Sequence, residues 1–302
     1  MMKHKTLTVS LLVMALWGLL FSLVKLGYQA FGLTGIGDIL TFAGFRFFIC
    51  GIVITGFALV RSPESFNGQL QNIPRIFAIG LFSVVLHYGF SYIGLNLTGS
   101  GKTAILKQLG AVFFICFSHL FFKDDKLTGK KLIALLLGVL GIVAINLRPE
   151  GLRFQLGDIL IILASFCTVI ANVISKKAPP NTPPIVLTGI SQLFGGVLLL
   201  IAGICANGSI LAVIPQTSDQ FAVFLPLIAT SCVSYCLWFA VVQKEDLSRL
   251  FIIKFTEPIF AAIFGWLLLG EDIFNLNYAA AFLLISAGIT VGNWKKRTPS
   301  AK

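Results

Sequence analysis

At 302 residues, the chain is 57% hydrophobic and only 12% charged, and it carries a net charge of +11. Soluble domains contain about 25% charged residues, so this composition excludes an ordinary soluble globular protein. The basic residues fall between long apolar runs, where membrane topology explains them better than nucleic-acid binding does. No nucleic-acid partner is therefore expected.

The apolar residues form ten runs of roughly twenty residues, the length at which an α-helix crosses a bilayer. The expected spans of the first half are 7–28, 39–60, 76–95, 103–122 and 132–147. Those of the second half are 158–175, 185–206, 221–242, 250–269 and 276–293. The connections are short and leave no room for a soluble domain. The pattern predicts an all-α membrane protein with ten transmembrane helices.

The first three spans carry polar or amphipathic side chains. Trp17 can pack its indole against a close helix or place it in a central cavity. Arg46 lies near the middle of the second span, where a buried guanidinium needs a partner. An internal pair, with Glu257 or with backbone carbonyls, is favoured for it over direct substrate contact. His87 and Tyr88 in the third span suit an amphipathic substrate, although tyrosine and tryptophan are also common at membrane interfaces.

Lys107 and Lys254 lie about six residues inside the fourth and ninth spans, roughly 9 Å deep at 1.5 Å per residue. Charges inside the hydrocarbon are costly and often functional. The two lysines are candidates for basic posts, one in each vestibule, that bind an anionic or carboxylate-bearing substrate. The alternative is that each lysine reaches its nearer interface through its flexible stem.

The eighth and ninth spans contain further candidates for substrate binding. Tyr235 and Trp238 combine an apolar body with a polar tip, as His87 and Tyr88 do. Glu257 follows Lys254 by three residues on the same helix face, so the two charges can neutralise each other. Glu257 is also the best candidate to bind a coupling proton. Pro258 removes a backbone hydrogen bond and can kink the helix beside the cavity.

Cysteine and histidine residues do not form a metal-binding pattern. The six cysteines all lie within apolar spans, and there are only three histidines. A packing role as small, polarizable side chains is enough to explain the cysteines. No metal, cofactor or catalytic residue is expected, and the chain is not expected to be an enzyme.

The second half repeats part of the first. Residues 248–293 align without a gap on residues 101–146, with 12 identities in 46 positions, including Lys107/Lys254 and Asp125/Asp272. About one match in ten would arise by chance. Tyr88 and Tyr235 share the same offset, and Arg46 corresponds to Gln192 at an offset of 146. We therefore expect two repeats, 1–150 and 151–302, that divide near 150–157.

The charge distribution predicts the orientation. With the N-terminus in the cytoplasm, 16 lysines and arginines lie inside and three outside. This asymmetry places both termini in the cytoplasm. Because each half has five spans, the second half enters the membrane from the opposite side. The expected fold is thus two inverted five-helix repeats around a central cavity.

Several motifs together resemble the EamA family of the drug/metabolite transporter superfamily. They are Trp17-Gly-x-x-Phe21-x-x-x-Lys25, Arg46, Glu257-Pro258-x-Phe260-Ala-Ala, Leu268-Leu-Gly-Glu271 and Ser286-Ala-Gly288. The resemblance covers essentially the whole chain and implies ten helices, a central cavity and alternating access without ATP. Members move amino acids, other metabolites, toxic compounds, sugars or nucleotide derivatives. Small relatives that expel cationic drugs use a glutamate in the first span, which has no acid here.

The resulting expectation is a secondary transporter of a small zwitterionic or anionic, amino-acid-like metabolite, with export favoured. It would function as a monomer in the bacterial inner membrane, surrounded by lipid, with a proton as the candidate coupling ion. The alternatives are uptake of a phosphorylated or nucleotide-type metabolite, a non-transporting membrane subunit, or a lipid flippase on the same scaffold.

Overall fold

The computed structural model describes residues 4–97, 106–146, 155–270 and 276–293, which form helices, turns and loops but no strand. The first half contains α1 (His4–Ala30), α2 (Ile36–Arg61), two short 3-10 turns, α3 (Ile73–Gly80), a π-helical segment (Leu81–Leu86), α4 (His87–Leu97), α6 (Leu109–Phe121) and α7 (Gly129–Asn146). The second half contains α8 (Leu156–Lys176), α9 (Pro184–Cys205), α10 (Ser218–Lys244), α11 (Leu247–Lys254), α12 (Glu257–Leu269) and α13 (Leu276–Asn293).

Seven described helical segments are long and apolar enough to cross a membrane. They cover Lys5–Ala30, Ile36–Arg61, Leu70–Gly94, Leu156–Lys176, Pro184–Cys205, Ser218–Lys244 and Leu247–Leu269. The chain is therefore an integral membrane protein made of helices. The expected spans 103–122, 132–147 and 276–293 are not among the seven. Shorter apolar helices, Leu109–Phe121 and Phe282–Val291, lie within two of them.

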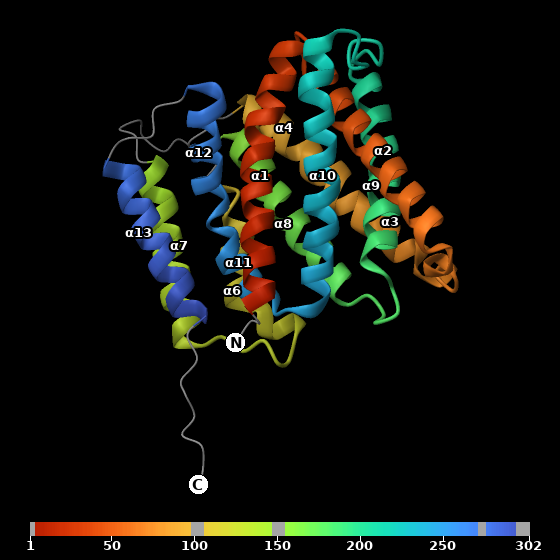
Figure 1. Cartoon of the computed structure of the whole chain (residues 1–302). Coiled ribbons are helices and arrows are strands. Elements are labelled where there is room, and N and C mark those ends of the chain that lie inside the picture. The colour runs from red at the N-terminus through yellow and green to blue at the C-terminus, as the bar shows by residue number, and fades with distance from the viewer. Residues whose placement is uncertain (1–3, 98–105, 147–154, 271–275, 294–302) are drawn as a thin grey trace.

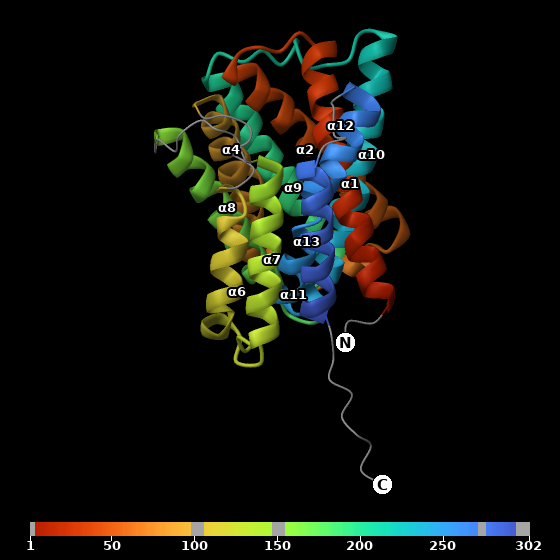
Figure 2. The same ribbon diagram turned by 90° about the vertical axis from the view of Figure 1, so that its left-hand side faces the viewer.

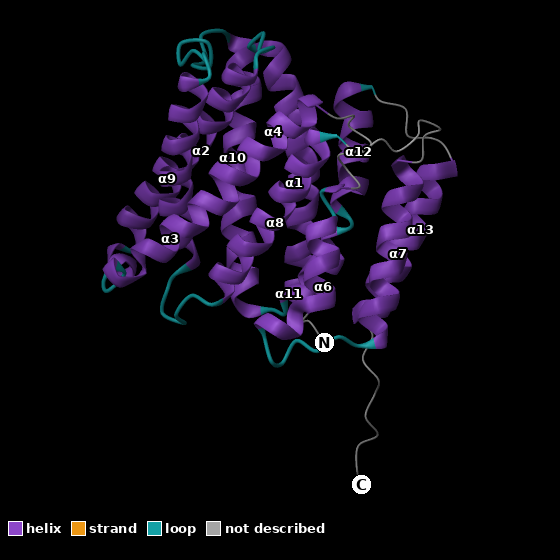
Figure 3. Ribbon diagram, turned by 180° about the vertical axis from the view of Figure 1, so that it is seen from behind, coloured by secondary structure: helices purple, strands orange, loops and turns teal. Residues whose placement is uncertain are grey.

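The helices pack as pairs that run along the bundle. The pair α7–α13 forms one flank and the pair α2–α9 lies toward the opposite flank (Figure 1). Between them, α1 packs against α10 and α12, while α8 packs against α4 and α6. Viewed from behind, the order of the flanks is reversed and the same pairs remain together (Figure 3). In the side view, α6 lies beside α7, and α11 lies close to α7 and α13 (Figure 2).

Both described ends of the chain lie at one end of the bundle. Helix α1 begins there and α13 ends there (Figure 1). This end is called the N/C end below. An even number of crossings brings the chain back to the side on which it started, as the predicted topology requires.

Small residues allow α2 and α9 to approach closely. A side chain at Gly51 would overlap the backbone of Leu193, and one at Gly196 would overlap the backbone of Phe48. Helices in membranes associate through this kind of close backbone contact, because lipid is as apolar as the side chains and gives no hydrophobic driving force. The close fit of the two backbones at these glycines thus determines how α2 and α9 pack on each other.

The ninth expected span is divided into two helices rather than kinked at Pro258. Helix α11 ends at Lys254 and α12 begins at Glu257, so the break lies at Phe255–Thr256. Pro258 lies in the first turn of α12, where its missing N–H leaves no hydrogen bond unmade. Gly270, with φ of 68°, ends α12 in the left-handed conformation that glycine adopts readily.

The fourth expected span also differs from a continuous helix. Lys107 and Gln108 form a turn, and α6 begins only at Leu109. The upstream part of that span and the predicted division of the chain near 150–157 fall largely on residues outside the described ranges. So does the acidic pair Glu271-Asp272. The ten-helix count and the two-repeat division remain predictions at this point.

Candidate functional site

Both interruptions of the membrane helices carry a lysine. Lys107 lies in the turn before α6, and Lys254 is the last residue of α11. The Lys107 Nζ atom lies 5.2 Å from the centre of the Phe21 ring, and the Lys254 Nζ atom lies 5.3 Å from the Trp17 ring. Phe21 and Trp17 are one turn apart on α1, so both lysines contact the same helix. The two charges are close enough to interact, which differs from the separate posts that the sequence suggested.

Glu257 belongs to the same charged group. It is the first residue of α12, where the positive end of the helix dipole favours a carboxylate. Its charge interacts with those of Lys107 and Lys254, and its buried Oε2 atom has no hydrogen-bond partner. His87 lies close enough to interact with both lysines. The structure thus brings His87, Lys107, Lys254 and Glu257 together in one interior cluster, called the charged cluster below.

Aromatic rings from three helices adjoin the charged cluster. The Trp17 ring lies 4.9 Å from that of Trp238 and 5.8 Å from that of Tyr235, measured between centroids. The hydroxyl groups of Tyr88 and Tyr235 share a hydrogen bond. Trp17, Tyr88, Tyr235 and Trp238, which the sequence suggested as contacts for an amphipathic substrate, therefore form one continuous aromatic wall.

Hydrogen bonds to α8 hold one residue of the aromatic wall and one residue of the charged cluster in place. Trp238 Nε1 donates to Asn172 Oδ1 at 2.8 Å. His87 Nδ1 donates to the Ala164 carbonyl at 2.9 Å and lies 2.9 Å from Thr168 Oγ1. Sequence reasoning did not select Asn172, because an asparagine within an apolar span carries no signal that identifies its partner. Its depth in α8, the first helix of the second half, was the available clue.

Arg46 is only 2% exposed, and its guanidinium lies 4.3 Å from the centre of the Phe47 ring and 5.4 Å from that of Tyr88. The expected internal pair with Glu257 or with backbone carbonyls is not seen. Within the described residues, the Nε and Nη2 atoms of Arg46 have no hydrogen-bond partner, and no ion pair involves them.

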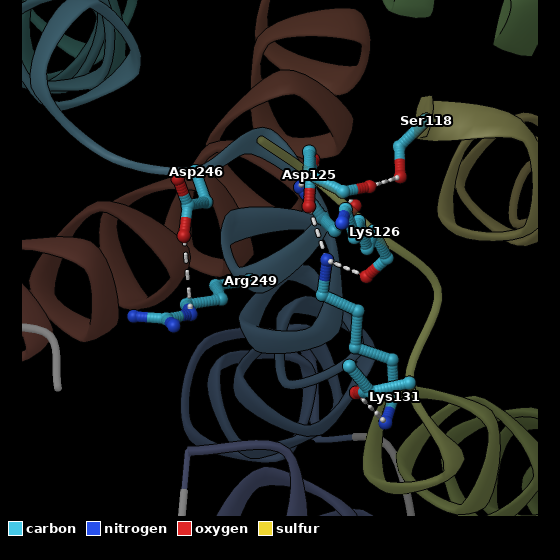
Figure 4. A network of polar contacts seen from close by, with 8 residues as sticks. Ser118, Asp125, Lys126, Lys131, Asp246 and Arg249 are labelled. Carbon is cyan, nitrogen blue, oxygen red and sulfur yellow. Dashed lines mark hydrogen bonds and ion pairs between the residues drawn. The ribbon is translucent and has the colours of Figure 1, made fainter. Parts of the chain in front are cut away.

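A buried ion pair lies at the N/C end of the bundle (Figure 4). The Lys131 ammonium pairs with the Asp125 carboxylate and also donates to the Lys126 carbonyl at 2.9 Å. Ser248 Oγ donates to the other Asp125 oxygen at 2.7 Å, and Ser118 Oγ donates to the Asp125 carbonyl at 2.7 Å. Asp125, Lys131 and Ser248, called the clasp below, tie the α6–α7 connection to the first turn of α11.

A second set of contacts joins other connections at the same end. Gln69 Nε2 donates to the Asn181 carbonyl at 3.1 Å, and Asn72 Nδ2 donates to Thr182 Oγ1 at 3.2 Å. Gln243 Nε2 donates to the Thr182 carbonyl at 3.3 Å. The α8–α9 loop is therefore bonded both to the loop before α3 and to the end of α10. Polar contacts thus join the connections at the N/C end at two separate places.

An all-helical membrane bundle with charges and aromatic rings at breaks in its helices has the construction of a membrane transport protein. The chain belongs to the EamA-like transporter family, whose model matches residues 4–147 and 155–292. The resemblance to the EamA family of the drug/metabolite transporter superfamily is thereby confirmed. The family consists of transporters and not of enzymes.

Relatives across nearly the full chain are also transporters. A protein of Escherichia coli (strain K12), named a probable amino-acid metabolite efflux pump, is 25% identical over 98% of this chain and 98% of its own length. An uncharacterized transporter of Bacillus subtilis (strain 168) is 26% identical over 92% of each chain. A WAT1-related chloroplastic protein of Arabidopsis thaliana is 28% identical over 81% of this chain, which spans 60% of that protein's length.

A solved crystal structure has the same fold. It superposes with a TM-score of 0.76 over 95% of this chain and 96% of the other, at 19% sequence identity. At this level of identity the likeness concerns the fold alone.

Proposed function

We propose that the protein is a secondary transporter that exports a small zwitterionic or anionic, amino-acid-like metabolite by alternating access. The observation that carries the proposal is the charged cluster beside an aromatic wall, within helices that are broken at that level. Such a site offers both charges and apolar surface to an amphipathic molecule. The name of the Escherichia coli relative, an amino-acid metabolite efflux pump, supports the substrate class and the direction.

The helix contacts support a pair of inverted repeats, 1–150 and 151–302, with ten helices in all. In the repeat, α1 corresponds to α8, α4 to α10, and α6 to α12. The contact between α1 and α10 therefore has its counterpart in the contact between α8 and α4, and the contact between α1 and α12 has its counterpart in that between α8 and α6. All four contacts occur. Helices α2 and α9 are counterparts that pack on each other, as are α7 and α13. Two counterpart residues can touch only near the axis that relates them. The bond between Tyr88 and Tyr235 therefore favours a pseudo-twofold axis through the aromatic wall.

Alternating access then consists of opening one end of the central cavity while the other end stays closed. The clasp, and the contacts of Gln69 and Asn72 with the α8–α9 loop, correspond to a state closed at the N/C end. The Lys and Arg distribution assigns this end to the cytoplasm, and we place the protein in a bacterial inner membrane as a monomer. Export begins when these contacts break and the substrate enters from the cytoplasm.

Each candidate residue has a proposed role. Trp17, Tyr88, Tyr235 and Trp238 contact the apolar part of the substrate. Lys107, Lys254 and Glu257 supply charge, and His87 adjoins them. Glu257 is the proposed carrier of a coupling proton, because its Oε2 atom is buried without a hydrogen-bond partner.

The test uses Lys107→Ala and Lys254→Ala in proteoliposomes that contain the full chain. Both proteins should insert and purify normally but transport labelled amino acids at least about tenfold more slowly, the equivalent of about 1.4 kcal/mol. Lys123→Ala is a matched control, because Lys123 is exposed in the connection after α6. If either interior variant transports at the wild-type rate, the lysines do not act on the substrate.

A further inference from the structure

Arg46 is the most unusual charge in the described part of the molecule. It lies near the middle of α2, a membrane helix, and its side chain is 2% exposed. Its Nε and Nη2 atoms are buried without a partner, whereas the lysines of the charged cluster have Glu257 as a counter-charge. A buried ionised group without a compensating charge is strongly unfavourable.

The aromatic rings near Arg46 do not satisfy its hydrogen-bonding groups. Phe47 and Tyr88 interact with the guanidinium through the charge of their ring faces. The N–H groups of Nε and Nη2 lie side by side on one edge of the guanidinium plane and point in the same direction. That edge matches the two oxygens of a carboxylate in a bidentate pair.

Hydroxyl groups that can donate a hydrogen bond to a carboxylate lie near Arg46. The hydroxyls of Tyr88, Tyr92 and Tyr235 are close enough to Arg46 to interact electrostatically with it. Tyr88 and Tyr235 currently bond to each other, so either hydroxyl can turn to donate to an arriving anion. Tyr88 interacts with both Arg46 and Glu257, and so connects this position with the charged cluster.

We infer that Arg46 binds the carboxylate group of the transported molecule through its Nε and Nη2 atoms. This inference rests on the proposed function and makes its substrate class specific: the substrate must carry a free carboxylate. The charged cluster and the aromatic wall then contact the remainder of the molecule. Arg46 is then the residue that pairs with the carboxylate, and Lys107 and Lys254 act on the rest of the molecule as part of the charged cluster.

The experiment compares acids with the corresponding amides, which keep the size of the ligand and remove its negative charge. The probes are L-leucine and L-phenylalanine with L-leucinamide and L-phenylalaninamide. Binding is measured on the purified full chain by titration calorimetry, and transport by counterflow in proteoliposomes. The wild type should prefer each acid to its amide by about 10- to 100-fold, the range for a hydrogen bond to a charged group.

The variants are Arg46→Gln and Arg46→Lys, with Arg61→Gln as the matched control at the exposed end of the same helix. In Arg46→Gln the preference for the acid should fall to within about threefold of unity, while the affinity for the amide changes little. Arg46→Lys keeps the charge but lacks the planar fork, so it should retain only part of the preference. Arg61→Gln should behave as the wild type. If Arg46→Gln does not fold, Arg46→Lys decides alone.

The outcomes distinguish a failure of the role inferred for Arg46 from a failure of the proposed function. A wild-type preference for acids that both Arg46 variants retain overturns the inference and leaves the proposed function standing. Equal loss of acid and amide binding in the variants shows a structural role and also overturns it. A wild type that neither binds nor transports any of the probes contradicts the proposed function itself.

Discussion

A buried polar side chain in this protein depends on a small number of partners, because neither lipid nor the core can replace a missing one. Trp238 shows this dependence at the scale of a single residue. Its indole is 2% exposed and donates to Asn172, which is also 2% exposed. The bond holds one end of the aromatic wall against α8.

Trp238→Phe removes the donor and leaves Asn172 Oδ1 buried without its partner. We expect the protein to lose about 1–3 kcal/mol of stability, the penalty for an unsatisfied buried group. Thermal unfolding in detergent measures this as a lower midpoint. Adding Asn172→Leu should recover part of the loss, since it removes the unsatisfied group. If the double variant is no more stable than Trp238→Phe alone, the explanation is contradicted.

At the scale of the elements, the clasp joins the connection after α6 to the start of α11. Asp125 is 4% exposed and Lys131 is 8% exposed, so their charges are removed from water and depend on each other. Loss of one partner of a buried ion pair is far more costly than loss of an exposed pair. The clasp is therefore placed to control opening at the N/C end.

Asp125→Asn keeps the size of the side chain and removes the charge that Lys131 needs. We expect the segments 123–131 and 247–254 to exchange their amide hydrogens at least about tenfold faster than in the wild type, because the N/C end opens more often. Hydrogen–deuterium exchange with mass spectrometry measures both segments. Asp124→Asn, at the exposed neighbouring position, should leave them unchanged. Unaltered exchange in Asp125→Asn would show that the clasp does not restrain this end.

The limits of sequence reasoning also appear at this scale. Hydropathy predicts the seven long apolar helices that the described residues form, and the repeat offset pairs Tyr88 with Tyr235, whose hydroxyls share a hydrogen bond. The position of Pro258 indicated an irregular ninth span, but the break lies at Phe255–Thr256. The pairing of Asp125 with Ser248 could not be predicted, because it joins residues 123 positions apart through the packing of several helices.

The same reasoning applies to the candidate site. The sequence selected Lys107 and Lys254 by their depth in apolar spans, but depth does not specify the neighbouring helix. Both lysines contact α1, through Phe21 and Trp17. Likewise, Arg46 was expected to have an internal partner, and its surroundings are aromatic instead. Side-chain identity predicts which groups are buried, whereas tertiary packing decides what they meet.

At the scale of the whole molecule, the orientation in the membrane can be tested with single cysteines. The positive-inside pattern places the α2–α3 connection in the cytoplasm and the α9–α10 connection outside. Glu64→Cys and Ser209→Cys, in a variant without the native cysteines, lie in these two connections. An impermeant thiol reagent added to intact cells should label Ser209→Cys only, and label Glu64→Cys after lysis. Labelling of both positions in intact cells would contradict the topology.

The central claim concerns what crosses the membrane, so transport by the purified full chain tests it most directly. Labelled amino acids and other small anionic and zwitterionic metabolites are offered to proteoliposomes, with and without a pH gradient. We expect uptake of one or a few carboxylate-bearing compounds, at a rate that falls at least about tenfold in Lys254→Ala. If the wild type moves none of these compounds and instead moves a cationic drug, a phosphorylated metabolite or a fluorescent lipid, the proposed function is wrong.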